Sequence, residues 1–230
     1  MIRTEIFVRA LFFSSWLLLL SCHKDNPVAA IDAGYNYFPS GIGHWIIYDV
    51  DSTYYEEGNG NVVTLKYQLK EIIESTFDDN SGRPTQRIER YTRLFNPDTP
   101  YDQLPWQIAA VWTSNLTPAL AERKEDNQTY IKLIFPPRAG KKWNGNASNA
   151  MDKWEYEYTA VDVAQTVNLS FDSTLTVTQT GLNDPIINIQ TSTEIYARNV
   201  GMIYKSFRSL KMQPDTSGSE YSMIIHDYSP

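Results

Sequence analysis

Apolar and polar residues alternate with a period of two along most of this chain. The clearest example is Thr166–Thr180, in which one set of alternate positions carries Val167, Leu169, Phe171, Ser173, Leu175 and Val177. The positions between them carry threonine, serine, asparagine and aspartate. A helix would scatter the apolar side chains around its circumference, whereas a strand places them on one face. The pattern predicts a long strand with one solvated face.

Further segments have strand-like patterns, and turn signals rich in glycine, asparagine and aspartate separate them. They are His44–Val50, Val63–Ile73, Arg87–Phe95, Trp106–Trp112, Ile131–Phe135, Trp154–Ala160, Ile186–Thr193, Met202–Leu210 and Tyr221–Tyr228. No helical pattern between strands indicates βαβ units, and one solvated face favours antiparallel pairing. We therefore predict a mainly all-β fold with little helix. It is an antiparallel meander of about ten strands, curved into a partial barrel or folded into two layers.

One segment, residues 191–201, fits two structures. Thr191-Ser192-Thr193-Glu194 has the form of a helix capping box, and the apolar run after it ends at Gly201. The flanking segments are strand-like and favour a strand here. Helix and strand both remain open at this point.

The first 22 residues have the pattern of a secretion signal. Arg3 and Arg9 precede an apolar core, Ala10–Leu20, which has the length of a signal-peptide core and is short for a membrane span. The small residue Ser21 follows, and then Cys22, the only cysteine of the chain. We expect residues 1–22 to be a signal peptide and residues 23–36 to be a flexible tether. Residues 37–230 would then be a single β-rich domain.

The sequence Leu19-Leu20-Ser21-Cys22 resembles a bacterial lipobox. The resemblance implies cleavage before Cys22, lipid attachment to Cys22, and anchoring of the protein to the outer membrane by its N-terminal lipid. Lys24-Asp25 is similar to the export signal of surface lipoproteins in the Bacteroidota. It favours the cell surface, and the periplasmic side of the membrane remains an alternative.

Three longer segments carry a second resemblance. They are YFPSGIGHWIIYDVDS, ERKEDNQTYIKLIFPPRAGKKWNGNA and EIYARNVGMIYK, which begin at Tyr37, Glu122 and Glu194. They look like segments of Bacteroidota envelope lipoproteins of unknown function. The resemblance implies a β-rich envelope lipoprotein and supplies no activity.

Composition excludes several kinds of chemistry. A formal charge of −7 gives no electrostatic basis for nucleic-acid binding. One cysteine and three scattered histidines do not provide a zinc site, and neither a nucleophile elbow nor a P-loop is present. We predict no metal, no cofactor and no enzymatic activity. Glu155 and Glu157 share one strand face, which we interpret as solvated, and Glu122–Asn127 is interpreted as an exposed, salt-bridged loop or strand start.

Aromatic residues provide the candidate ligand site. They are more numerous than a small core requires, and amphipathic rings suit both apolar and sugar ligands. The possible ligand groove comprises Trp45, Trp106, Trp112, Trp143, Trp154, Tyr156 and Tyr158. Packing of these rings in the core of the sheet is the alternative.

Three functions remain open on the sequence alone. The first is an outer-membrane lipoprotein that acts as a non-catalytic binding or structural module of the envelope, with a protein or glycan partner. The second is a carrier of an apolar or glycan ligand in an aromatic-lined half-barrel. The third is a hydrolase whose site residues are dispersed in the sequence.

Overall fold

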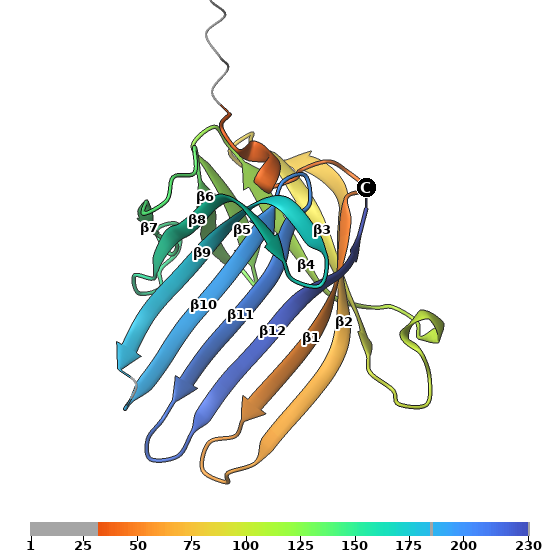
Figure 1. Ribbon diagram of the computed structural model, residues 1–230, viewed down its shortest axis with the longest axis vertical. Coiled ribbons are helices and arrows are strands. Elements are labelled where there is room, and N and C mark those ends of the chain that lie inside the picture. The colour runs from red at the N-terminus through yellow and green to blue at the C-terminus, as the bar shows by residue number, and fades with distance from the viewer. Residues whose placement is uncertain (1–31, 185, 230) are drawn as a thin grey trace, which may run out of the picture. The chain divides into compact units, whose positions relative to one another are not determined.

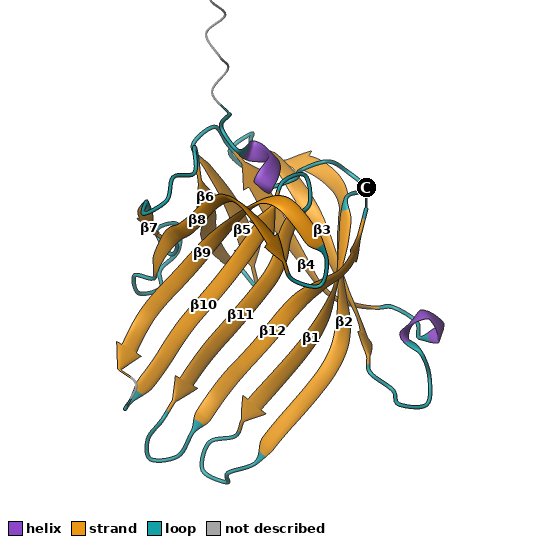
Figure 2. Cartoon of the chain, in the orientation of Figure 1, coloured by secondary structure: helices purple, strands orange, loops and turns teal. Residues whose placement is uncertain are grey.

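Twelve antiparallel strands form one sheet in the computed structural model, which describes residues 32–184 and 186–229. The strands are β1 (Trp45–Tyr55), β2 (Val62–Asp78), β3 (Pro84–Leu94), β4 (Gln107–Leu116), β5 (Leu120–Glu125), β6 (Gln128–Ile134), β7 (Lys142–Asn144), β8 (Glu155–Thr166), β9 (Ser170–Asp184), β10 (Asn188–Ala197), β11 (Gly201–Lys211) and β12 (Ser217–Tyr228). The described helices are two single 3₁₀ turns, η2 (Tyr35–Tyr37) and η3 (Tyr101–Gln103). The prediction of an all-β antiparallel fold is confirmed (Figure 2).

The sheet is nearly closed. Strands that are consecutive in the chain pair with each other, except β6 and β7, which form the two edges of the sheet. β1 also pairs with β12, so the sheet runs from β6 through β1 and β12 to β7. It curls until its edges meet, and the backbone N–H of Ile131 on β6 donates to the carbonyl of Gly145, 2.9 Å away. The predicted partial barrel is therefore the arrangement that forms (Figure 1).

Side chains close the seam between the two edges. The hydroxyl of Tyr158 donates to the carbonyl of Ile134 and accepts from its N–H, at 2.9 Å in both cases. The indole of Trp143 donates to the carbonyl of Ile131 at 2.9 Å. A Cβ at Gly145 would lie only 2.3 Å from a ring atom of Tyr156, so only glycine allows this close approach.

The predicted strand over residues 166–180 is wrong in one respect. β8 ends at Thr166 and β9 begins at Ser170, with these two residues paired across a tight turn. The N–H of Val167 donates to the carbonyl of Leu169 within that turn. The alternation of apolar and polar residues continues through the turn, so the pattern alone did not locate it.

Other boundaries also differ from the predictions. β1 and β2 continue to Tyr55 and Asp78, and β5 and β7 are additional strands. In the segment 191–201, β10 runs to Ala197, and a turn leads into β11 at Gly201. The strand interpretation of this segment is confirmed.

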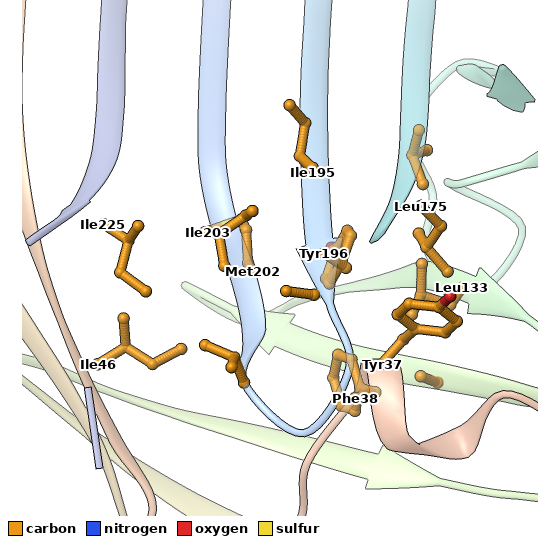
Figure 3. Close-up of a cluster of buried hydrophobic side chains, with 14 of the residues drawn as sticks. Tyr37, Phe38, Ile46, Leu133, Leu175, Ile195, Tyr196, Met202, Ile203 and Ile225 are labelled. Carbon is orange, nitrogen blue, oxygen red and sulfur yellow. The ribbon is translucent and has the colours of Figure 1, made fainter. Parts of the chain in front are cut away.

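The end of the barrel beside η2 is filled with apolar side chains. Tyr37 and Phe38 are buried with Leu133, Leu175 and Tyr196 in one cluster (Figure 3). The Tyr37 hydroxyl also donates to Asp162, 2.9 Å away. The compact unit that contains the sheet begins at Ala33, so it includes the last residues of the segment that the sequence analysis treated as a tether.

The opposite end is open because the strands differ in length. β2 has 17 residues and β9 has 15, whereas β5 and β6 have 6 and 7. The long strands therefore extend past the short ones (Figure 1). At this end none of the twelve described strands lies opposite the inner face of the sheet.

Candidate functional site

A layer of charged side chains crosses the barrel interior below the apolar cluster. Alternation along each strand directs these side chains to the same face as buried Leu69. We call the group the ion layer. It consists of Glu71, Arg90, Arg123, Glu125, Lys132, Glu194 and Lys205, contributed by β2, β3, β5, β6, β10 and β11.

Two carboxylates organise the ion layer. Glu71 accepts from Arg90 at 2.8 Å and from Arg123 at 2.5 Å. Glu194 is fully buried and accepts from Lys132 at 2.5 Å, while Lys205 Nζ lies 3.1 Å from it. Charge-assisted hydrogen bonds of this kind offset the loss of hydration of buried ions.

Both carboxylates are ionised in the folded protein. Burial opposes the charge on Glu71, but the guanidinium groups of Arg123 and Arg90 hold its pKa below the ordinary value. Burial likewise opposes the charge on Glu194, but the ammonium groups of Lys132 and Lys205 hold its pKa well below the ordinary value. Neither carboxyl group therefore carries a proton to donate near neutral pH.

The closed part of the barrel is too full to hold a ligand. A cavity of about 60 Å³ lies between Phe38, Tyr48 and Arg123, and a crevice of about 20 Å³ lies within the ion layer. Small-molecule sites have volumes of about 300–1,000 Å³. These spaces have room for a few water molecules at most.

A band of aromatic rings lies beside the ion layer. The ring of Trp154 is 6.2 Å from Tyr156 and 6.0 Å from Phe207, and Phe207 stacks on Tyr221 at 5.1 Å. Phe207 and Tyr221 are paired residues of β11 and β12. The band extends across the inner face from β8 to β12, and Phe207 and Tyr221 are only half-buried.

Apolar side chains continue from this band into the open end. We define the concave face as Tyr54, Val63, Leu65, Tyr67 and Leu94, which occupy inward positions of β1, β2 and β3. Leu65 is 50% exposed and Leu94 is 63% exposed, although Leu69 on the same face of the same strand is 2% exposed. Contiguous exposed apolar side chains of this kind mark a binding surface.

The seven aromatic residues of the predicted groove lie in three places. Trp143, Trp154, Tyr156 and Tyr158 pack together near the seam, and Trp154 also joins the aromatic band. Trp112 covers the guanidinium of Arg90, whose Cζ is 3.4 Å from the ring centroid. Trp45 and Trp106 lie beside Lys70 and Arg93, on the opposite face of the sheet from Leu69 and Glu71.

The prediction that the charge run Glu122–Asn127 is exposed is wrong for its first residues. Residues up to Glu125 form β5, and Glu122 and Arg123 are buried rather than exposed. Arg123 reaches Glu71 from a segment 52 residues away in the chain. Local sequence gave no signal for that partner, so the ion layer was missed.

Two other clusters of carboxylates are already paired. Glu155 and Glu157 both contact Lys142, at 2.7 and 3.3 Å. Glu122 accepts from Arg83 at 2.9 Å and from Ser148 at 2.8 Å. It lines a groove of about 770 Å³ whose walls are mainly polar, unlike the mainly apolar walls of small-molecule sites.

Comparisons with known proteins give two weak structural matches. No protein-family model and no curated protein matches the sequence. A Bacteroides fragilis structure, provisionally described as an exported protein with a YmcC-like fold, is 11% identical, with a TM-score of 0.42, and the match covers 84% of this chain and 98% of that one. A Parabacteroides distasonis structure, provisionally described as a lipoprotein, is 9% identical, with the same TM-score and coverage.

No helix within residues 32–184 and 186–229 has the length and hydropathy that a membrane span requires. Cys22 lies outside the described residues.

Proposed function

We propose that this protein is a non-catalytic binding module of the cell envelope. It is held at the outer membrane by lipid on Cys22 and carries its ligand on the concave face. The observation that supports the ligand site is the exposure of Val63, Leu65 and Leu94 at inward positions of the sheet. Inward side chains of a sheet normally pack in the core, so an apolar ligand that covers them would stabilise the complex by about 25 cal/mol per Å² of apolar surface.

The proposal favours a carrier with an open site over a carrier with an enclosed one. Among the described residues, the cavities at Tyr48 and in the ion layer of the closed part have volumes of about 60 and 20 Å³, so we place the ligand along the sheet. The aromatic band adjoins the concave face. Tyr67 of the concave face is paired with Val50 on β1, and Tyr221 of the band is paired with Ser52, two residues further along β1. A ligand on this surface would contact rings at one end and aliphatic side chains at the other.

The ligand site is tested by binding of Nile red, an uncharged dye that fluoresces in apolar surroundings. The soluble chain beginning at His23 keeps the whole compact unit and is used throughout. Leu65→Asn should weaken dye binding at least about fivefold, because it places an amide in the apolar surface. Val62→Asn is the matched control, since Val62 is 56% exposed on the same strand but faces the other side.

Equal dye binding by the two variants would refute the concave face as the site. Both positions are exposed, so the free energy of unfolding should change by about 0.5 kcal/mol or less in either variant. A urea titration of each variant checks that the loss of binding is not a loss of folding.

The anchor is tested separately in cells. Cys22→Ser removes the thiol to which lipid would be attached, and the protein should move from the membrane fraction to the soluble fraction. Ser21→Ala is the control, because it keeps the cysteine and a small residue before it. Retention of the Cys22→Ser variant in membranes would show that another segment holds the protein there.

A further inference from the structure

The crevice in the ion layer carries a surplus of positive charge. Its four cations, Arg90, Arg123, Lys132 and Lys205, face three carboxylates, those of Glu71, Glu125 and Glu194. Glu71 and Glu194 each serve two cations, as described above. One positive charge of the layer is therefore not balanced within it, and an uncompensated buried charge costs several kcal/mol.

One hydrogen-bond donor in the same crevice has no partner among the described residues. Arg123 is 8% exposed, and its Nε–H makes no hydrogen bond within residues 32–184 and 186–229. Glu125 Oε1 lies 3.8 Å from this nitrogen, which is beyond hydrogen-bond distance. The same oxygen lies 3.8 Å from Lys132 Nζ. The crevice thus offers both positive charge and a free donor to an incoming oxygen atom.

The crevice adjoins the apolar surface. Tyr221 and Lys205 line the crevice. Tyr221 also belongs to the aromatic band, together with Phe207, which lies two residues beyond Lys205 on β11. From there the apolar surface continues along β2 from Tyr67 to Val63, about 13 Å at about 3.3 Å per residue. A volume of about 20 Å³ admits one small polar group and excludes anything larger.

We infer that the ligand of the concave face is an acidic amphiphile with a single acyl chain. Its carboxylate lies at the crevice, close to Lys205 and Arg123, and its chain follows the aromatic band and then Leu65 and Val63. This inference rests on the proposed function, since it names the ligand class for the same surface. Charge complementarity selects the acid over an uncharged lipid of the same length.

The test compares decanoate with decanol as competitors for Nile red on the soluble chain. The two probes share one chain length and differ in the charged group. Decanoate should displace the dye at a concentration about tenfold lower than decanol, the effect expected of one charge-assisted hydrogen bond. In Lys205→Met the ratio of the two displacing concentrations should fall to about threefold or less.

Lys66→Met is the matched control. Lys66 is paired with Asp51 at 3.1 Å and its side chain is 61% exposed, so the same charge change occurs far from the crevice. It should leave the preference for decanoate unchanged. Should Lys205→Met fail to fold, the wild-type ratio and its decrease with added salt still decide the question.

The outcomes separate the two ideas. Equal displacement by decanoate and decanol would overturn the acidic ligand but leave the concave face as an apolar site. Equal loss of selectivity in Lys66→Met and Lys205→Met would assign the effect to net charge and overturn the crevice. Absence of dye binding by the wild-type protein would refute the proposed function itself.

Discussion

The inner face of this sheet has two halves that differ in an unusual way. The closed half, beside η2, is opposed by short strands and holds a layer of ions around Glu71 and Glu194. The open half, the concave face, has no strand opposite it and carries apolar side chains such as Val63 and Leu65. Burial normally favours the reverse distribution, with apolar groups inside and charges in water.

The difference separates the tasks of the two halves. Replacing a buried ion cluster with packed apolar residues is often neutral or stabilising, so the ion layer is not required for stability alone. Exposed apolar side chains likewise add little to the stability of the free protein. The buried ions and the exposed apolar side chains meet at the crevice. A site for an acidic amphiphile requires this arrangement, with positive charge beside an apolar surface.

Glu194→Gln should give the largest loss of stability. The substitution leaves Lys132 and Lys205 as buried cations without their carboxylate, at a cost of about 3–5 kcal/mol in the free energy of unfolding. Urea unfolding followed by tryptophan fluorescence measures it. Glu57→Gln, which alters an exposed pair with Lys211, should show no measurable change.

The pH dependence of stability provides an independent check on the same pair. The pKa of Glu194 is lower in the folded protein than its ordinary value of 4.5. The stabilisation is therefore complete above about pH 4.5 and is lost as the pH falls below it. The wild-type protein should lose stability in acid more steeply than Glu194→Gln. Parallel curves would mean that folding does not lower the pKa of Glu194.

Sequence patterns predict the fold better than the site because strand formation is largely local. The alternation in Val63–Ile73 is enough to predict β2 and the shared face of Leu65 and Leu69. Two predictions fail for different reasons: the alternation continues through the turn after Thr166 and hides it, and the charged residues Glu122 and Arg123 of β5 are buried rather than exposed.

The candidate site depends on contacts that no local pattern contains. Glu194 and Lys132 are 62 residues apart, and they meet only because β6 and β10 lie on opposite walls of the barrel. The alternation of β2 places Leu65 and Leu69 on one face. It does not show that other strands cover Leu69 and leave Leu65 exposed. The large number of aromatic residues pointed to a ligand surface, but it did not show that Trp45 and Trp106 lie on the other face.

Leu69 and Leu65 allow the sharpest comparison of the two halves. Replacing either residue with alanine should lower the free energy of unfolding by less than Glu194→Gln does. Leu69→Ala should lower the free energy of unfolding by about 2–5 kcal/mol, because it leaves a cavity in a packed interior. Leu65→Ala, four residues away on the same face, should change it by about 0.5 kcal/mol or less, because the side chain is 50% exposed. Urea titrations of both variants measure the difference, and addition of decanoate should increase the effect of Leu65→Ala because only the wild-type side chain gains contacts with the ligand. Similar losses at both positions without ligand would mean that the open half is covered in the free protein, and the concave face would then not be available for binding.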